Sequence, residues 1–233
     1  GLLCKPDGGI LDDVFVFRLD EDRFVIVVNA SNTAKALSWL RRRLGDRAKL
    51  SDRTEETSMF ALQGPRAIET LSAVAGFHAD ELPRFGVDEY AVGNRVWQIS
   101  RTGYTGEDGV EVVVPAVDSM AVWTAVVAPD AVTPAGLAAR DSLRFEPGFP
   151  LYGHEIDEKR TPVEARLTWA CEFDRSFVGR DAILERKRIG VTEKLVTFRM
   201  TGRGMPRQGC AVVDEKGRHI GDVATGMYAP TLD

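Results

Sequence analysis

The feature that most constrains the fold is a glycine-rich run between two strand-like segments. It reads Ser100-Arg-Thr-Gly-Tyr-Thr-Gly-Glu-Asp-Gly-Val-Glu-Val-Val-Val-Pro115. Strand-forming residues occupy 95–100 before the glycines and 110–114 after them. Because glycine adopts the positive φ angles that tight connections need, the run predicts a β-hairpin. Its loop is longer than the roughly two to five residues of a plain hairpin, so we expect it to carry function.

Glu111 stands out in this hairpin because it lies among valines in the second strand. An acid in an apolar strand costs free energy unless it is paired, solvated or bound to a ligand. Successive side chains of a strand point to opposite faces, so the alternation by itself places Glu111 on the solvent face of a two-sided strand.

The composition excludes several functional classes. The chain has 233 residues, of which 44% are hydrophobic and 28% are charged, as in ordinary globular proteins. Its net charge of -5 gives no basic surface for nucleic acid. No apolar run approaches the roughly 20 residues of a membrane span. The three cysteines and three histidines are widely spaced, so we expect no metal site and a reducing, cytoplasmic compartment, or the mitochondrial matrix in a eukaryote.

Hydrophobic periodicity and turn residues predict an α+β fold of mixed helices and antiparallel sheet. We expect three consecutive regions, 1–84, 85–187 and 190–233, of which the last is all-β. The expected strands are 10–17, 24–29, 57–62, 87–92, 95–100, 110–114, 194–200, 211–213 and 220–226, and the expected helices are 33–44, 65–74, 117–128, 134–145 and 177–187.

Two neighbouring aspartates, Asp12 and Asp13, lie in the first expected strand, and Asn29 ends the second. Since neighbours in a strand face opposite sides, we expect only one of the two aspartates to point inward. Asn29 either begins the turn that caps the following helix or offers its amide to a ligand.

Several motifs together resemble the aminomethyltransferase, or T-protein, of the glycine cleavage system. The longest is Arg101-Thr-Gly-Tyr-Thr-Gly-Glu-Asp-Gly-Val-Glu111, a low-degeneracy match. Gly8-Gly-Ile-Leu-Asp-Asp13, Ala61-Leu-Gln-Gly-Pro65, Ala138-Ala-Arg-Asp-Ser-Leu-Arg144 and Leu151-Tyr-Gly-His154 agree with it in order. The resemblance covers nearly the whole chain. It implies a fragment lacking both family termini, with folate-binding α+β regions followed by the start of a C-terminal β-barrel domain.

The resemblance also implies a reaction. Members of this family transfer an aminomethyl group from the dihydrolipoyl arm of an acidic carrier protein to tetrahydrofolate, which yields methylene-tetrahydrofolate and ammonia. By the same resemblance Asp13 is the catalytic residue. Glu111 pairs with the pterin, Asn29 supports it, Arg140 faces the ligand, and Tyr104 and Tyr152 pack beside its flat rings.

Other functions remain open at this point. The folate domains of sarcosine- and dimethylglycine-type dehydrogenases and some sulfur-compound demethylases have the same fold. A non-catalytic folate-binding protein of iron–sulfur assembly is a further alternative, but that group carries Cys-Tyr-x-Gly-Gln-Glu where this chain has Gly103 before Tyr104. The chain also lacks a dinucleotide-binding Gly-x-Gly-x-x-Gly motif after a strand. A fragment that folds without activity is the last alternative.

Overall fold

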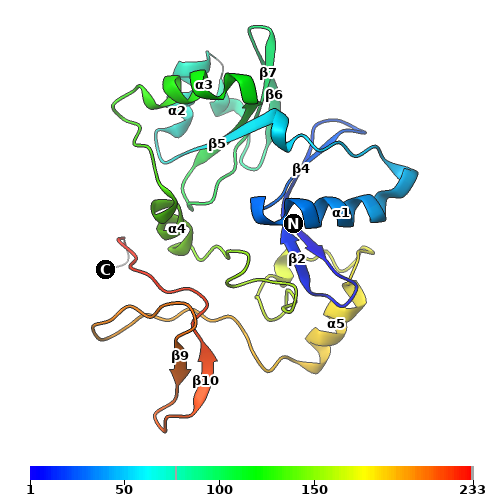
Figure 1. The fold of residues 1–233 in the computed structure, drawn as a ribbon, viewed down its shortest axis with the longest axis vertical. Coiled ribbons are helices and arrows are strands. Elements are labelled where there is room, and N and C mark those ends of the chain that lie inside the picture. The colour runs from blue at the N-terminus through cyan, green and yellow to red at the C-terminus, as the bar shows by residue number, and fades with distance from the viewer. Residues whose placement is uncertain (77, 232–233) are drawn as a thin grey trace. The chain divides into compact units, whose positions relative to one another are not determined.

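A computed structural model describes residues 1–76 and 78–231, which group into two compact units (Figure 1). Unit 1 comprises residues 1–16, 26–45 and 148–233, and unit 2 comprises 17–25 and 46–147. Neither unit is a continuous stretch of sequence. The three consecutive regions expected from the sequence therefore do not coincide with these units, and their boundaries stay a prediction.

Unit 2 is built on a four-stranded antiparallel sheet in the order β5-β8-β7-β6. The strands are β5 (Thr57–Gln63), β6 (Val87–Val92), β7 (Arg95–Ser100) and β8 (Gly109–Pro115). Two helices, α2 (Ala67–Ala75) and α3 (Ser119–Val127), cover one face of this sheet (Figure 1). A third helix, α4 (Leu137–Phe145), follows them in the chain. The hairpin predicted from the glycine-rich run is the β7–β8 pair, so that prediction is confirmed.

The period-2 pattern of β8 determines the two faces of the sheet. Val110, Val112 and Val114 are buried and pack with residues of α2 and α3 in one hydrophobic core. Glu111 points to the other face, where its cross-strand neighbours are Ala61 and Ser100. The valines thus pack β8 against α2 and α3, and Glu111 points to the opposite face of the sheet.

Unit 1 begins with an antiparallel pair, β1 (Leu2–Cys4) and β2 (Ile10–Asp13). It also contains α1 (Thr33–Leu44), α5 (Arg180–Ile189) and the antiparallel pair of β9 (Ala211–Val213) and β10 (His219–Asp222). Its core includes the buried residues Ile10, Ile156 and Ala165. Gly9 allows the loop that contains Glu158 to approach closely, since a Cβ there would lie 2.1 Å from the carbonyl oxygen of Glu158.

Short elements complete the chain. The strands β3 (Phe15–Arg18) and β4 (Phe24–Val27) form a two-stranded sheet. Single 3-10 turns occur at Ala30–Asn32, Gly45–Arg47, Thr54–Glu56, Ala79–Glu81, Ala116–Asp118 and Thr168–Ala170.

Three predicted elements differ clearly in the structure. The strand expected over 220–226 is β10, which ends at Asp222. The single strand expected over 10–17 divides into β2 and β3 at Val14, whose amide donates to the carbonyl oxygen of Gly1. The strand expected over 194–200 is wrong, because the structure shows no regular element there. A strand needs a neighbour for its ladder, and the backbone bond recorded in this segment joins the amide of Leu195 to the carbonyl oxygen of Glu164. In the part of the chain that the structure describes, the strands after residue 190 form only the two-stranded β9–β10 hairpin, so the start of a β-barrel stays a prediction.

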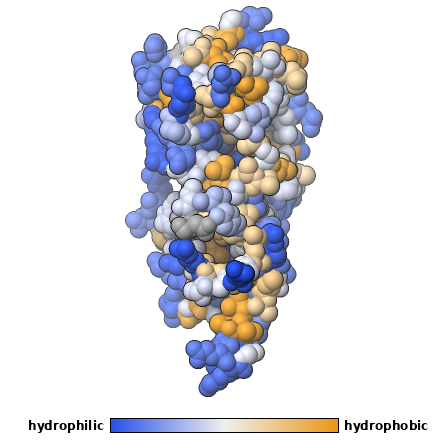
Figure 2. Space-filling model, turned by 90° about the vertical axis from the view of Figure 1, so that its left-hand side faces the viewer, coloured by the Kyte–Doolittle hydropathy of each residue, from blue (hydrophilic) through white to orange (hydrophobic). Residues whose placement is uncertain are grey.

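The surface has a mixed character. On the face that Figure 2 presents, hydrophobic residues form separate groups among hydrophilic ones. Among the described residues, no helix is long and apolar enough to cross a membrane.

Candidate functional site

Glu111 is buried, contrary to the solvent position that the strand alternation favours. Only 7% of its surface is exposed. Its Oε2 accepts a hydrogen bond of 2.5 Å from the Thr102 hydroxyl, which lies 2.8 Å from the hydroxyl of Ser100. Within the described residues no donor reaches the other carboxylate oxygen, Oε1. The alternation identified the correct side of the strand, but the loop after β7 covers that side at this position.

The side chain of Gln63, the last residue of β5, makes hydrogen bonds that hold the glycine-rich loop in place. The Nε2 atom of Gln63 donates to the carbonyl oxygens of Thr102 at 3.1 Å and Val110 at 3.2 Å, while its Oε1 accepts from the Thr105 hydroxyl at 3.1 Å. A Cβ on Gly103 would lie 1.7 Å from Gln63 Oε1. A side chain at position 103 would displace the amide of Gln63 from the hydrogen bonds that it makes to this loop.

An ion pair joins the two ends of the same loop. Arg101 donates to both carboxylate oxygens of Asp108, at 3.0 and 2.7 Å, and also to the carbonyl oxygen of Leu82 at 2.9 Å. The Arg101 guanidinium lowers the pKa of Asp108 below its ordinary value. The bidentate geometry fixes the loop more specifically than a single contact would.

Tyr104 and Arg140 lie together, although 36 positions separate them in the sequence. The Arg140 guanidinium, on α4, stands 4.9 Å from the centroid of the Tyr104 ring. Arg140 is exposed and Tyr104 is half-buried. An arginine stacked on an aromatic ring in this way keeps its hydrogen-bond donors available at the edge of the stack.

Asp12, Asp13 and Asn29 form a compact polar cluster in unit 1. The Asn29 Nδ2 atom lies 2.9 Å from Asp12 Oδ1 and 2.7 Å from Asp13 Oδ1. Asp12 has no exposed surface, and it also accepts from the backbone amide of Asn29 at 3.1 Å and from Asn32 Nδ2 at 2.5 Å. Asp12 is fully buried while Asp13 keeps some exposure, and both carboxylates reach the side-chain amide of the same asparagine.

The surroundings of Asp13 change its pKa. Burial raises the pKa of Asp13 above its ordinary value, the amide of Asn29 opposes this by donating a hydrogen bond, and the neighbouring Asp12 raises the pKa further. Asp13 keeps some exposure, whereas Asp12 is enclosed by its donors. Asp13 is therefore the aspartate of this pair that a ligand or solvent can reach.

Tyr152 is also in unit 1, and its hydroxyl already has partners. It donates to the carbonyl oxygen of Ile10 at 3.2 Å and accepts from Lys35 Nζ at 2.7 Å. The ammonium group lies 4.3 Å from the centroid of the Tyr152 ring and 3.1 Å from the carboxylate of Glu158. These contacts fix the orientation of the ring.

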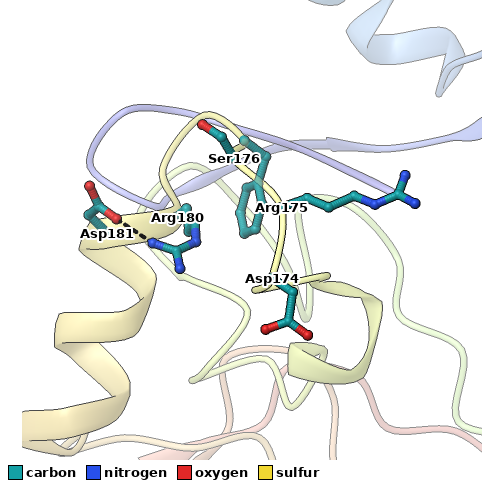
Figure 3. A pocket seen from close by; sticks show the side chains of 6 residues that line it. Asp174, Arg175, Ser176, Arg180 and Asp181 are labelled. Atoms are coloured by element: carbon teal, nitrogen blue, oxygen red, sulfur yellow. Dashed lines mark hydrogen bonds and ion pairs between the residues drawn. The ribbon is translucent and has the colours of Figure 1, made fainter.

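A polar pocket of about 200 Å³ lies at the start of α5 (Figure 3). Its labelled side chains include Arg180 and Asp181, which form an ion pair of 2.9 Å. None of the residues that the sequence predicts for the site lines this pocket. Among the described residues no group of three or more His, Cys, Asp or Glu side chains could hold a metal ion. The residues that line the pocket are Asp174, Arg175, Ser176, Phe177, Arg180 and Asp181.

Comparison with known proteins identifies the family. Residues 1–175 match the GCVT N-terminal domain. The chain belongs to the GCVT N-terminal domain family. The resemblance drawn from the sequence motifs is thereby confirmed, and the mixed helix and antiparallel-sheet fold agrees with it.

Curated relatives and a solved structure share this similarity. The chain is 43% identical to the aminomethyltransferase of Herpetosiphon aurantiacus over 234 aligned residues, which cover 100% of this chain and 64% of the relative. It is 41% identical to the aminomethyltransferase of Chlorobaculum parvum, with 99% and 65% covered. The crystal structure of glycine cleavage system aminomethyltransferase T from Bartonella henselae matches 99% of this chain and 63% of its own, with a TM-score of 0.91 and 34% identity. The chain thus spans slightly less than two thirds of these relatives.

Within this member of the GCVT family, the six residues predicted for the site form two groups. Asp13, Asn29 and Tyr152 lie in unit 1, where the first two are in direct contact. Glu111, Tyr104 and Arg140 lie in unit 2, where the last two are in contact.

Sequence reasoning missed several residues that shape these groups. Thr102 and Gln63 belong to motifs quoted from the sequence, but their side-chain roles follow from contacts across strands. Lys35 lies in a helix that the sequence marks only as amphipathic, 117 positions before its partner Tyr152.

Proposed function

We propose that this chain is part of a tetrahydrofolate-dependent aminomethyltransferase of glycine cleavage. It would take the aminomethyl group from the dihydrolipoyl arm of a carrier protein and act in the cytoplasm, or in the mitochondrial matrix of a eukaryote. The relatives described above are named aminomethyltransferases. Their names favour this reaction over those of the dehydrogenase-type, demethylase-type and iron–sulfur assembly relatives.

The observation that carries the proposal is the burial of Glu111 together with its carboxylate oxygen that accepts no hydrogen bond from the described residues. Glu111 is 93% buried, and one of its carboxylate oxygens accepts no hydrogen bond among the described residues, so that oxygen is available to a donor of a ligand. The ring N–H and amino group of a pterin are such donors, and an ionised carboxylate accepts hydrogen bonds and donates none. The chemistry of the residues therefore fits a reduced folate bound at Glu111.

Two further contacts support the binding part of the proposal. Arg140, stacked on Tyr104, has guanidinium donors suited to a carboxylate or carbonyl of folate. Tyr152, fixed by Lys35 and the carbonyl oxygen of Ile10, offers an oriented aromatic face.

Asp13 is the proposed catalytic residue, with Asn29 as its orienting partner. In the proposed reaction the transferred carbon forms bonds to two folate nitrogens, while its bonds to sulfur and to the amino nitrogen break. The two protons that leave the folate nitrogens go to the dihydrolipoyl sulfur and to ammonia, so that atoms balance. The carbon becomes cationic as its bonds break, and a fixed carboxylate such as Asp13 stabilises that charge. Its accessible position beside the Asn29 amide supports this role.

The test of the folate assignment is the variant Glu111→Ala. Calorimetric titration of tetrahydrofolate should show an affinity loss of about 1.5–3 kcal/mol, because a hydrogen-bonded charged group is removed. Glu69→Ala, in the same unit on the exposed surface of α2, is the matched control and should bind as the unaltered protein does. Equal affinity of Glu111→Ala and the unaltered protein would refute the assignment.

A further inference from the structure

Ser100, Thr102 and Glu111 form a chain of side-chain contacts on the sheet face opposite α2 and α3. The two hydroxyl oxygens are 2.8 Å apart, and the second lies 2.5 Å from Glu111 Oε2. All three residues are buried, with exposed fractions of 3%, 5% and 7% in chain order. Each hydroxyl has one proton, so the number of hydrogen bonds it can donate is fixed.

The direction of these hydrogen bonds follows from the carboxylate. An ionised Glu111 can only accept, so the Thr102 hydroxyl must donate its single proton to Oε2. The contact between the two hydroxyls is then satisfied only if Ser100 donates to Thr102. The alternative acceptor of Ser100, the carbonyl oxygen of Glu111, is farther away at 3.4 Å. Both protons therefore point toward the carboxylate.

This arrangement makes the two oxygens of Glu111 unequal. Oε2 is held by Thr102, whereas Oε1 accepts nothing from the described residues. A carboxylate with one oxygen fixed cannot rotate freely about its terminal bond, so the direction of the other oxygen is set before a ligand arrives. Such preorganisation strengthens binding because less conformational freedom is lost.

We infer that Thr102, oriented by Ser100, is a positioning residue that holds Oε2 of Glu111 and directs Oε1 toward a hydrogen-bond donor of the ligand. The inference rests on the proposed function for the nature of that ligand, a flat heterocycle with N–H donors on its edge. The inference predicts that the pterin is bound by Oε1 alone and not by both carboxylate oxygens. Oε2 already accepts a hydrogen bond from Thr102.

The test compares three substitutions in the complete polypeptide, with tetrahydrofolate affinity measured by calorimetric titration. Thr102→Val keeps the shape and removes the donor, so binding should weaken roughly tenfold. Thr102→Ser restores a hydroxyl and should bind within about twofold of the unaltered protein. Thr70→Val, at a threonine of α2 that is 8% exposed, is the matched control for the exchange itself and should bind unchanged.

A double-substitution cycle with Glu111→Ala separates positioning from a general loosening of the sheet. If Thr102 acts through Glu111, Thr102→Val should weaken binding no further once the carboxylate is absent. An equal loss in both backgrounds, or Thr102→Val binding as the unaltered protein does, overturns the inference. Should Thr102→Val fail to fold, Ser100→Ala replaces it, with an expected two- to threefold loss that also disappears without Glu111.

The same data distinguish the two proposals. If Glu111→Ala itself binds normally, the folate assignment fails and the inference fails with it. If Glu111→Ala binds weakly while Thr102→Val and Ser100→Ala bind normally, the assignment stands and only the positioning role is refuted.

Discussion

Asp12 and Asp13 are neighbours in sequence and share one asparagine, but their surroundings suit different roles. Asp12 is enclosed and accepts hydrogen bonds from Asn29 and Asn32. Asp13 keeps access to solvent and has a raised pKa that results first from burial. A fully satisfied buried carboxylate organises its neighbours, whereas an accessible one can respond to charge on a ligand.

The first prediction concerns the proposed catalytic step. Asp13→Asn should lower turnover about a hundred- to a thousandfold while folate affinity is kept, because the lost contact acts on developing charge. Asp12→Asn should reduce turnover far less but lower the free energy of unfolding by about 1–3 kcal/mol, since it disturbs buried hydrogen bonds. Ammonia release from aminomethylated carrier protein and denaturant unfolding measure the two effects. A larger loss of turnover with Asp12→Asn would contradict the assignment.

The second prediction is a pH dependence. The carboxylate of Asp13 must be ionised to stabilise a cation, so turnover should fall as the pH drops through its pKa, which lies above the ordinary 3.8. Asn29→Ala removes the donor that lowers this pKa. The acidic limb of the pH–rate profile should therefore move to higher pH, as measured by ammonia release across a pH series. A limb that stays in place or moves to lower pH would show that Asn29 does not act on Asp13.

At the scale of elements, close backbone contacts explain why small residues occupy particular positions. In the β1–β2 hairpin, Gly9 touches the loop that contains Glu158, and the amide of Ile10 donates to the carbonyl oxygens of Asp157 and Arg160. The glycine-rich loop of unit 2 is likewise fitted to the side chain of Gln63. In both places the motif glycine leaves room for another part of the chain.

The third prediction tests this packing. Gly9→Ala should destabilise the protein by about 1–3 kcal/mol, because the new methyl group overlaps a backbone oxygen that cannot rotate away. Gly202→Ala is the control in the same unit, since a Cβ there meets nothing within 4 Å, and its effect should stay within about 0.5 kcal/mol. Urea unfolding curves of the two variants give the comparison. Equal midpoints and slopes of the two unfolding curves would contradict the prediction, because the β1–β2 hairpin would then accept the methyl group without loss of stability.

At the scale of the whole molecule, charge bears on the proposed carrier protein. The chain has 30 Lys and Arg residues against 35 Asp and Glu residues, so its net charge of -5 would repel an acidic partner. Association with such a partner requires a local group of basic side chains that outweighs the net charge.

The fourth prediction follows from that requirement. Raising the salt concentration should lower the rate when carrier protein is limiting, because exposed charges are screened over about 10 Å at 0.1 M salt. The rate with tetrahydrofolate limiting should change less, which serves as the internal control. Turnover at several salt concentrations under both conditions provides the measurement. A rate that is independent of salt with carrier limiting would count against electrostatic docking.

The sequence by itself determined the local elements and the family. Helix α1 falls on the predicted residues 33–44, and β6 and β7 fall on 87–92 and 95–100, because periodicity and turn residues act over short distances. The Arg101–Glu111 motif indicated the family because such a long run of specific residues rarely recurs by chance.

Only the tertiary structure decided which polar side chains are buried and which partners they bond. Strand alternation gives two faces but does not say what covers each one, so it could not show that Thr102 and its loop bury Glu111. Nor could it show that Asp12 and Asp13 share the side-chain amide of Asn29, which lies 17 and 16 positions away in the sequence. The segment 194–200 has a strand pattern without a paired neighbour. In each case the deciding partner lies outside the local sequence, and hydrogen bonding between distant segments determines the outcome.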